Sequence, residues 1–326
     1  MGRMGPKEQA SIGSTFMIPI LQSIIPIFLL VLLGIVLKRW KSIDQSFWPG
    51  LEQFGYFVAF PALLSMTLYQ ADFAALDVGR VALTVAITLA FMMVFVLSLW
   101  PIMQRRGVTA SSFTTIFQTG IRWNGFVALA IASSLHGDQG IALVALVMAL
   151  IILPINLVCV AVMVWFGGGA RKLSVLALGM ARNPLILSCL IGLGARLLPF
   201  EIPGPILTAI DLIAASSLGL GLLMVGAGLR IGDALKPRPV SALTSAIKLV
   251  LFPAVMTLVA VLVGLEGATL EILVLCAAVP TAMNGYLLAR QMNGDAPLYA
   301  AITTIQTAAS IGTMPLALFL LRQLSG

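Results

Sequence analysis

The sequence consists almost entirely of runs of about twenty mostly apolar residues, separated by short polar segments. One helix needs about 20 apolar residues to cross a bilayer, so each run is long enough for a span. Only 10% of the 326 residues are charged, whereas soluble domains carry about a quarter. Backbone groups must be paired in lipid, and the runs lack the alternation of barrel strands, so helices are predicted. We expect ten spans, at 17–37, 49–69, 79–101, 112–135, 139–166, 183–199, 204–229, 239–264, 269–291 and 297–322.

The basic residues are unevenly distributed over the predicted loops. The loops after the odd-numbered spans carry most of them: Lys38, Arg39, Lys41, Arg105, Arg106, Arg171, Lys172, Arg182, Arg230, Lys236, Arg238 and Arg290. The tails and even-numbered loops carry Arg3, Lys7, Arg80, Arg196 and Arg322. The positive-inside rule therefore predicts that both termini lie outside the cytoplasm. The same rule accounts for the net charge of +7, so the bilayer is the expected partner and nucleic acid is not.

The chain contains two copies of one unit. Residues 82–89, "ALTVAITL", return at 242–249 as "ALTSAIKL", and "NGF" at 124–126 returns as "NGY" at 284–286. Further matches at nearly the same offset of about 160 residues join Pro154 to Pro315, and Pro26, Gly34 and Lys38 to Pro184, Gly192 and Arg196. Because each copy has an odd number of spans, the second copy must enter the membrane upside down. Inverted repeats of this kind are typical of secondary transporters.

The repeat sets the expected domain boundaries. We predict a disordered tail at 1–16, a first five-helix repeat at 17–166, a short basic cytoplasmic linker at 167–182 and a second repeat at 183–322.

Spans 4 and 9 are predicted to be broken near their centres. Span 4 carries "TGIRWNG", in which Gly120 and Gly125 weaken the helix by roughly 1 kcal/mol each relative to Ala. Span 9 carries "AVPTAMNG", in which Pro280 removes a backbone donor and Gly285 follows the asparagine. Breaks at corresponding positions of two halves indicate a transporter's binding site. Their free helix N-termini attract anions, and the side chains of Asn124 and Asn284 can patch the backbone or bind a ligand.

Arg122 lies within the first break. A buried arginine in a span costs about 2.5–3.5 kcal/mol on insertion scales, so it must face water, a partner or a ligand. A planar guanidinium suits a carboxylate, which predicts a small organic anion as substrate. The alternatives are a structural pair with Asp211 in span 7, or an interfacial position.

Other polar residues within the spans complete the candidate site. Gln118, Thr281 and Gln306 are substrate-binding candidates, although Gln118 and Gln306 could equally bond neighbouring helices. Asp211 and Ser310 are candidates for proton or ion coupling, and Lys248 could pair with Asp211 or extend to a membrane interface. Asn156 is expected to satisfy the carbonyl that Pro154 frees. Four residues are expected at the surface, where water solvates them: Glu52, Asp77, His136 and Glu271.

The sequence speaks against an enzyme and a metal site. It has one histidine and no G-x-S-x-G or H-E-x-x-H motif. Cys159, Cys189 and Cys276 are scattered through the spans without metal-ligand spacing. We expect no cofactor apart from a coupling H⁺ or Na⁺.

The chain resembles the auxin efflux carrier family, in particular its short bacterial members, which are called malate or malonate permeases. The motifs that carry this resemblance are "FPALLSMTL" at 60–68, "GIRWNGFVALAIASSLHG" at 120–137, "RNPLILSCLIGL" at 182–193, "VPTAMNGYLLARQMNGD" at 279–295 and "ITTIQTAASIGTMPLAL" at 302–318. The resemblance implies a bacterial inner-membrane homodimer with a fold like that of bile-acid sodium symporters. Spans 1, 2, 6 and 7 would form a dimerising scaffold, and spans 3–5 and 8–10 a transport domain in which broken spans 4 and 9 cross.

The resemblance also assigns roles to residues of the breaks. Asn124 and Asn284 correspond to the family's crossover asparagines, and Pro280 to its proline in span 9. Plant members have a proline in the span-4 break, where this chain has glycines and Arg122. The predicted function is alternating-access transport of mono- or dicarboxylates such as malate or malonate, or of aromatic acids such as auxin. The alternatives are a passive anion channel, a sodium-coupled symporter of the bile-acid type and a sensor that binds without transport.

Overall fold

The computed structural model describes residues 6–71, 76–167, 184–235, 238–283 and 285–325, and every regular element in these ranges is helical. The elements are α1 (Pro6–Arg39), α2 (Phe47–Phe54), η1 (Gly55–Ala59), α3 (Phe60–Gln70), α4 (Val78–Ser98), α5 (Trp100–Arg105), α6 (Ala110–Ile121), α7 (Gly125–Gly167), α9 (Pro184–Ala195), α10 (Gly204–Gly228), α11 (Ile231–Ala234), α12 (Pro239–Ala246), η2 (Ile247–Leu251), α13 (Phe252–Val263), α14 (Gly267–Ala278), α15 (Gly285–Gln291) and α16 (Ala296–Ser325). The prediction of an all-α chain is confirmed for this part of the molecule. The predicted linker lies almost wholly outside the described residues.

Six of the described helical segments are long and apolar enough to cross a membrane: 20–39, 78–105, 110–166, 204–228, 239–263 and 296–324. The fourth and fifth predicted spans together form one of these segments, which bends at Gly137. The second span is a continuous helix at 47–70, but Glu52 and Gln53 lower its hydropathy. Only 12 residues of the sixth span lie in α9, and the ninth is divided between α14 and α15. The structure therefore supports a polytopic membrane protein.

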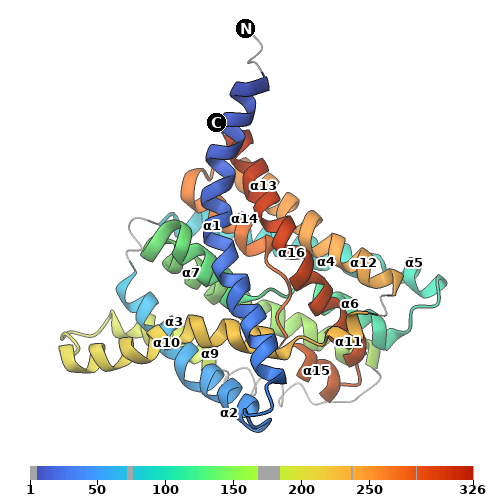
Figure 1. The fold of residues 1–326 in the computed structure, drawn as a ribbon, viewed down its shortest axis with the longest axis horizontal. Helices are drawn as coiled ribbons and strands as arrows, with labels where there is room; N and C mark the ends of the chain where they lie inside the picture. The colour runs from blue at the N-terminus through green and yellow to red at the C-terminus, as the bar shows by residue number, and fades with distance from the viewer. Residues whose placement is uncertain (1–5, 72–75, 168–183, 236–237, 284, 326) are drawn as a thin grey trace.

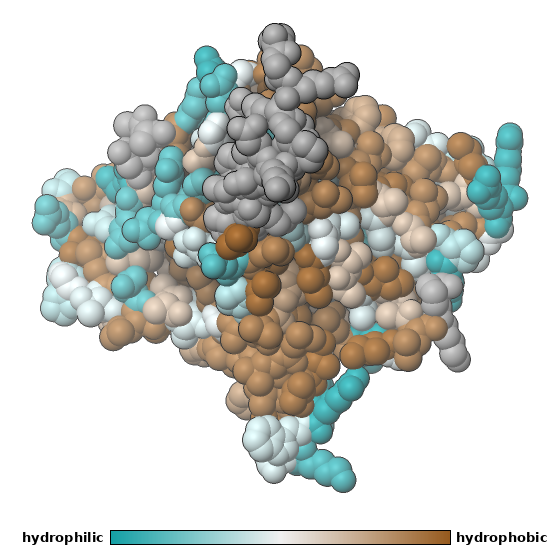
Figure 2. Space-filling view, turned by 45° about the horizontal axis from the view of Figure 1, so that its top comes forward, coloured by the Kyte–Doolittle hydropathy of each residue, from teal (hydrophilic) through white to brown (hydrophobic). Residues whose placement is uncertain are grey.

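The surface of the molecule is also typical of a membrane protein. Large apolar side chains are exposed on several long helices, for example Leu29 of α1, Val94 of α4 and Leu212 of α10. Figure 2 shows broad hydrophobic areas on the visible face, with hydrophilic residues gathered mainly towards its rims. Lipid tails can solvate such a surface, whereas water cannot.

The first helix starts earlier than predicted. Helix α1 begins at Pro6, within the stretch 1–16 for which disorder was expected. Proline suits the first position of a helix, and the following Lys, Glu, Gln and Ala are good helix formers. Figure 1 shows α1 beginning and α16 ending on one side of the molecule, with α2 and α15 on the opposite side.

Two π-helical turns precede prolines. The turns η1 and η2 each lead into a Phe-Pro pair, Phe60-Pro61 and Phe252-Pro253. Within each helix the proline lacks an N–H and its ring crowds the carbonyl four residues earlier. The wider turn takes up that misfit, because the N–H of Phe60 bonds to the carbonyl of Gly55 and that of Phe252 to Ile247. Both helices thus continue through their prolines.

Glycines allow two pairs of helices to approach closely. A β-carbon at Gly34 of α1 would overlap the backbone of Leu223 in α10, and one at Gly192 of α9 would overlap that of Ser65 in α3. Gly34 and Gly192 are partners in the sequence repeat, so equivalent positions of the two halves make equivalent close contacts. Small residues commonly permit such contacts between membrane helices.

Helices α6 and α14 form the centre of the molecule. Residues 113–122 and 270–281 are buried on every face. A helix without an exposed face belongs to the core, not to the lipid boundary. The segments that follow these helices are therefore also held deep inside the fold.

The expected surface position of His136 and Glu271 is wrong. Helix α7 bends at Gly137, whose φ of +54° lies in the left-handed region that glycine tolerates. The bend brings His136 Nε2 within 3.1 Å of Glu271 Oε2, and Arg322 Nη2 donates to Glu271 Oε1 at 2.6 Å. Glu271 is 8% exposed. These three residues tie the bend of α7 to α14 and to the end of α16.

Candidate functional site

The first interruption separates α6 from α7. Helix α6 ends at Ile121, and residues 122–124 are not helical before α7 begins at Gly125. Arg122 has extended geometry, and its N–H makes the last helical bond, to Gln118, at 2.8 Å. Asn124 Oδ1 accepts the N–H of Val127 at 3.3 Å, so asparagine caps the new helix. The Asn-Gly pair thus restarts the chain as a helix.

Arg122 is held by two neutral amides. Its Nε donates to Gln118 Oε1 at 3.2 Å, and its Nη2 donates to Asn156 Oδ1 at 3.0 Å. Asn156 is itself oriented, because its Nδ2 donates to the carbonyl of Ile152 at 2.8 Å. The bond to Ile152 differs from the expected role of Asn156, which was to satisfy the carbonyl freed by Pro154.

The positive charge of Arg122 is not neutralised by the described protein. Arg122 is only 6% exposed, and none of the ion pairs between described residues includes it. The alternative of a pair with Asp211 is wrong, since Asp211 is an exposed residue of α10 that lines a separate hollow between α3, α7 and α10. Lys248 does not pair with Asp211 either, because it is buried and donates to the carbonyl of Ala277 at 2.7 Å. A buried cation with only neutral acceptors favours an anion as its missing partner.

The second interruption separates α14 from α15. Helix α14 ends at Ala278, residues 279–283 are not helical, and α15 begins at Gly285. Asn284, a substrate-binding candidate, lies outside the described residues. Gln306 of α16 bridges the two breaks: its Oε1 accepts the N–H of Thr281 at 3.0 Å, and its Nε2 donates to the carbonyl of Thr119 at 3.1 Å. Both ends of this amide are therefore occupied by main chain.

Tyr299 supports the second break from α16. Its hydroxyl donates to the carbonyl of Ala282 at 2.7 Å. A β-carbon at Gly285 would overlap that hydroxyl. Gly285 is thus required for close approach of the tyrosine.

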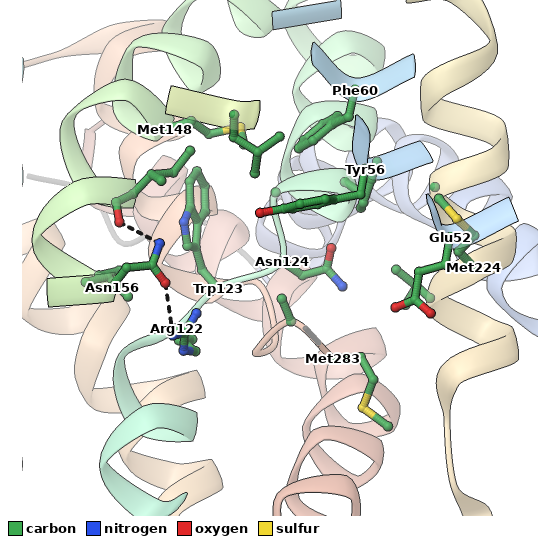
Figure 3. Close-up of a pocket in the computed structure, with 18 residues that line it drawn as sticks. Glu52, Tyr56, Phe60, Arg122, Trp123, Asn124, Met148, Asn156, Met224 and Met283 are labelled. Atoms are coloured by element: carbon green, nitrogen blue, oxygen red, sulfur yellow. Dashed lines mark hydrogen bonds between the residues drawn. The ribbon is translucent and has the colours of Figure 1, made fainter. Parts of the chain in front are cut away.

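A cavity of about 190 Å³ opens beside both breaks (Figure 3). One wall is the first break with the start and middle of α7, and the second break adds Ala282 and Met283. The facing wall comes from α2, η1, α3, α9 and α10, including Glu52, Tyr56 and Phe60. In Figure 3 the ring of Tyr56 reaches across the cavity towards Trp123, and Asn124 lies between Tyr56 and Met283. This volume suits a small ligand rather than a drug-sized one.

The predicted site residues divide into two groups. Arg122, Asn124 and Gly125 line the cavity. The remaining described candidates are not among its lining residues: Gln118, Gly120, Asp211, Pro280, Thr281, Gly285, Gln306 and Ser310. Gln118 holds Arg122, Gln306 and Thr281 join the breaks, and Ser310 donates to the carbonyl of Thr307.

Sequence reasoning missed several residues that line the cavity. Glu52 was expected to be solvated near a span end, yet it shares the cavity with Arg122. Tyr56, Trp123 and Asn156 also line it. Glu52 and Tyr56 are four residues apart on one helix, so the sequence could have predicted that they lie on the same face. Among the described residues no three His, Cys, Asp or Glu side chains form a group that could hold a metal ion.

Comparison with known proteins finds transporters and carriers. Residues 170–318 match a family described as "Membrane transport protein". Over 313 residues, 92% of this chain and 95% of the other, the chain is 28% identical to a protein of Rhizobium meliloti (strain 1021) named "Putative malonate transporter". It is 22% identical to "Uncharacterized transporter YfdV" of Escherichia coli (strain K12), over 93% of this chain and 98% of that one. It is 33% identical to "Auxin efflux carrier component 1" of Arabidopsis thaliana over 122 residues, 35% of this chain and 19% of that protein.

The predicted resemblance to the auxin efflux carrier family is confirmed by these comparisons. The matched family and both bacterial relatives are named as transport proteins. The bacterial relatives match it over nearly their whole length, whereas the plant carrier matches over about a third of this chain. The chain thus resembles the short bacterial proteins over its whole length and the plant carrier over only a part.

Proposed function

We propose that the protein carries small organic anions, mono- or dicarboxylates, across the membrane by alternating access. The observation that supports this most directly is Arg122. It is a buried guanidinium with two fixed neutral partners, and it lines a cavity beside two broken helices. A carboxylate bound there would supply the negative charge that Arg122 lacks among the described residues. A relative's name includes malonate, which is a small anion of this class.

The architecture that we propose for this transport has ten spans in two inverted repeats. The matched close contacts of Gly34 with α10 and of Gly192 with α3 support an approximate twofold relation between the halves. Helices α1, α2–α3, α9 and α10 would form the scaffold, and the remaining spans the transport domain with crossing breaks. The cavity lies between these two groups, which is where a sliding domain would carry a substrate. A homodimer in a bacterial inner membrane, with both termini outside the cytoplasm, completes the proposal.

Phe126, at the start of α7, contacts the scaffold wall of the cavity. We expect the transport domain to slide along this contact. The Phe126 ring lies 4.2 Å, centroid to centroid, from that of Phe60. A β-carbon at Gly221 of α10 would overlap the Phe126 ring. The start of α7 therefore packs against Phe60 and Gly221 through Phe126 and makes no ion pair there among the described residues.

The test is counterflow of labelled malonate in proteoliposomes. A carrier gives saturable exchange that unlabelled malonate accelerates, and Arg122→Ala abolishes it while the purified protein stays folded. Ohmic anion current without counterflow would instead establish a channel, and binding without flux a sensor. Imposed Na⁺ and H⁺ gradients, applied separately, identify the coupling ion. Normal exchange by Arg122→Ala would refute the assigned role.

A further inference from the structure

The cavity carries a second charge, on the wall opposite Arg122. Glu52 lies on α2 and Tyr56 on the π turn that follows, about one helical turn apart, and both line the cavity. Figure 3 shows the Glu52 carboxylate on the far side of Asn124 from Arg122. The two charges are more than 4.0 Å apart, since no ion pair joins them. Glu52 therefore does not neutralise Arg122 directly.

The Glu52 carboxylate is available to a ligand. The side-chain hydrogen bonds between described residues leave its oxygens without a protein donor, and the residue is exposed at the cavity. Arg122 and Glu52 are the charged residues among those lining the cavity, and Tyr56 is a further titratable group there. The site thus presents one positive and one negative end, with the phenol of Tyr56 between them.

We propose that Glu52 selects the charge state of the substrate. This inference rests on the proposed function. The accepted ligand is a small monoanion whose carboxylate binds Arg122 and whose other end donates a hydrogen bond to Glu52. A hydroxyl, an amide N–H or a protonated second carboxyl meets that requirement. A fully ionised dicarboxylate places its second negative charge against Glu52 and is disfavoured, which is selection by repulsion.

Three small acids of matched size separate the possibilities. Malonate is a dianion well above its second pKa, malonamate is a monoanion with amide N–H donors, and monomethyl malonate is a monoanion without a donor at that end. Their affinities are measured by competition against labelled malonamate in counterflow and by calorimetry on the purified protein, at one pH where malonate is fully ionised. For the wild type we expect malonamate to bind best and malonate worst.

Glu52→Gln preserves the shape of the side chain and removes its charge. We expect the ratio of malonate to malonamate affinity to rise by about tenfold or more, the size of one lost charge repulsion near a protein surface. Glu52→Asp keeps the charge and should keep the wild-type order. Glu201→Gln, which neutralises an exposed carboxylate outside the cavity lining, is the matched control and should leave the ratio unchanged.

The outcomes separate this inference from the proposed function. If the wild type binds anions but the ratio in Glu52→Gln stays within about twofold of its wild-type value, the role of Glu52 is refuted and the carrier proposal stands. If the wild type binds none of the three acids and catalyses no exchange, the proposed function itself fails. Melting temperatures of each variant confirm that the compared proteins are folded.

Discussion

The two helix breaks share an Asn-Gly pair but are built differently. The first break holds a charged side chain between two amides and lines the cavity with Arg122, Trp123 and Asn124. The described part of the second break carries no charge, and its main chain is satisfied by Gln306 and Tyr299. The first break therefore holds a buried charge without an ion-pair partner among the described residues, whereas hydrogen bonds from α16 fix the backbone of the second. This difference predicts opposite effects of substitution on binding and on stability.

The largest effect is expected from replacing the charge of the first break. Arg122→Met should weaken malonate binding by about 100-fold or more, because charge-assisted hydrogen bonds contribute about 1.5–3 kcal/mol each. Without ligand the same variant should melt at a higher temperature, since an unpaired buried charge destabilises the fold. Calorimetry and thermal unfolding of the purified protein measure the two quantities. A variant that melts lower and binds normally would contradict the comparison.

Substitution at the second break should lower the stability of the protein. Gln306→Leu leaves the Thr281 N–H and the Thr119 carbonyl buried without partners. Each such group costs about 1–3 kcal/mol, so the melting temperature should fall by several degrees. Gln139→Leu, at an exposed amide on α7, is the control and should melt like the wild type. Equal melting of the two variants would show that Gln306 does not bridge the breaks.

A third change supplies the missing anion from the protein itself. Asn156→Asp places a carboxylate where Arg122 Nη2 now donates to an amide oxygen. The internal pair should compete with substrate and weaken binding about tenfold, while the protein melts no lower than the wild type. An Asn156→Asp variant that binds malonate as well as the wild type would argue against Arg122 as the anion's contact.

The smallest effect is expected where Gly285 lies close to the Tyr299 hydroxyl of α16. Gly285→Ala forces the Tyr299 hydroxyl away and should cost about 1–3 kcal/mol by overpacking. Tyr299→Phe removes that hydroxyl and its bond to Ala282, at a cost of about 1 kcal/mol. The double variant should be less destabilised than the sum, because the second change relieves the first. Thermal unfolding of the three proteins gives the coupling, and strict additivity would exclude the contact.

The sequence determined the helical class, the positions of both breaks and the place of Arg122 within the first of them. These follow from features that act locally: long apolar runs, glycines, a proline and an Asn-Gly restart. The bend at Gly137 lies between the predicted spans 4 and 5, as their bounds imply, whereas the start of α1 at Pro6 was missed. The burial of Glu271 was missed because its partners, His136 and Arg322, are distant in the chain.

Only the tertiary structure decided which polar residues meet. Glu52, Arg122 and Asn156 come from three separate elements, and Gln306 joins breaks that are more than 150 residues apart in the sequence. In a soluble helix the apolar stripe shows which face is buried. Here lipid is as apolar as the protein core, so the hydropathy of a span does not show which face points inward. The pairing of side chains in the cavity therefore depends on helix packing, which the sequence pattern leaves open.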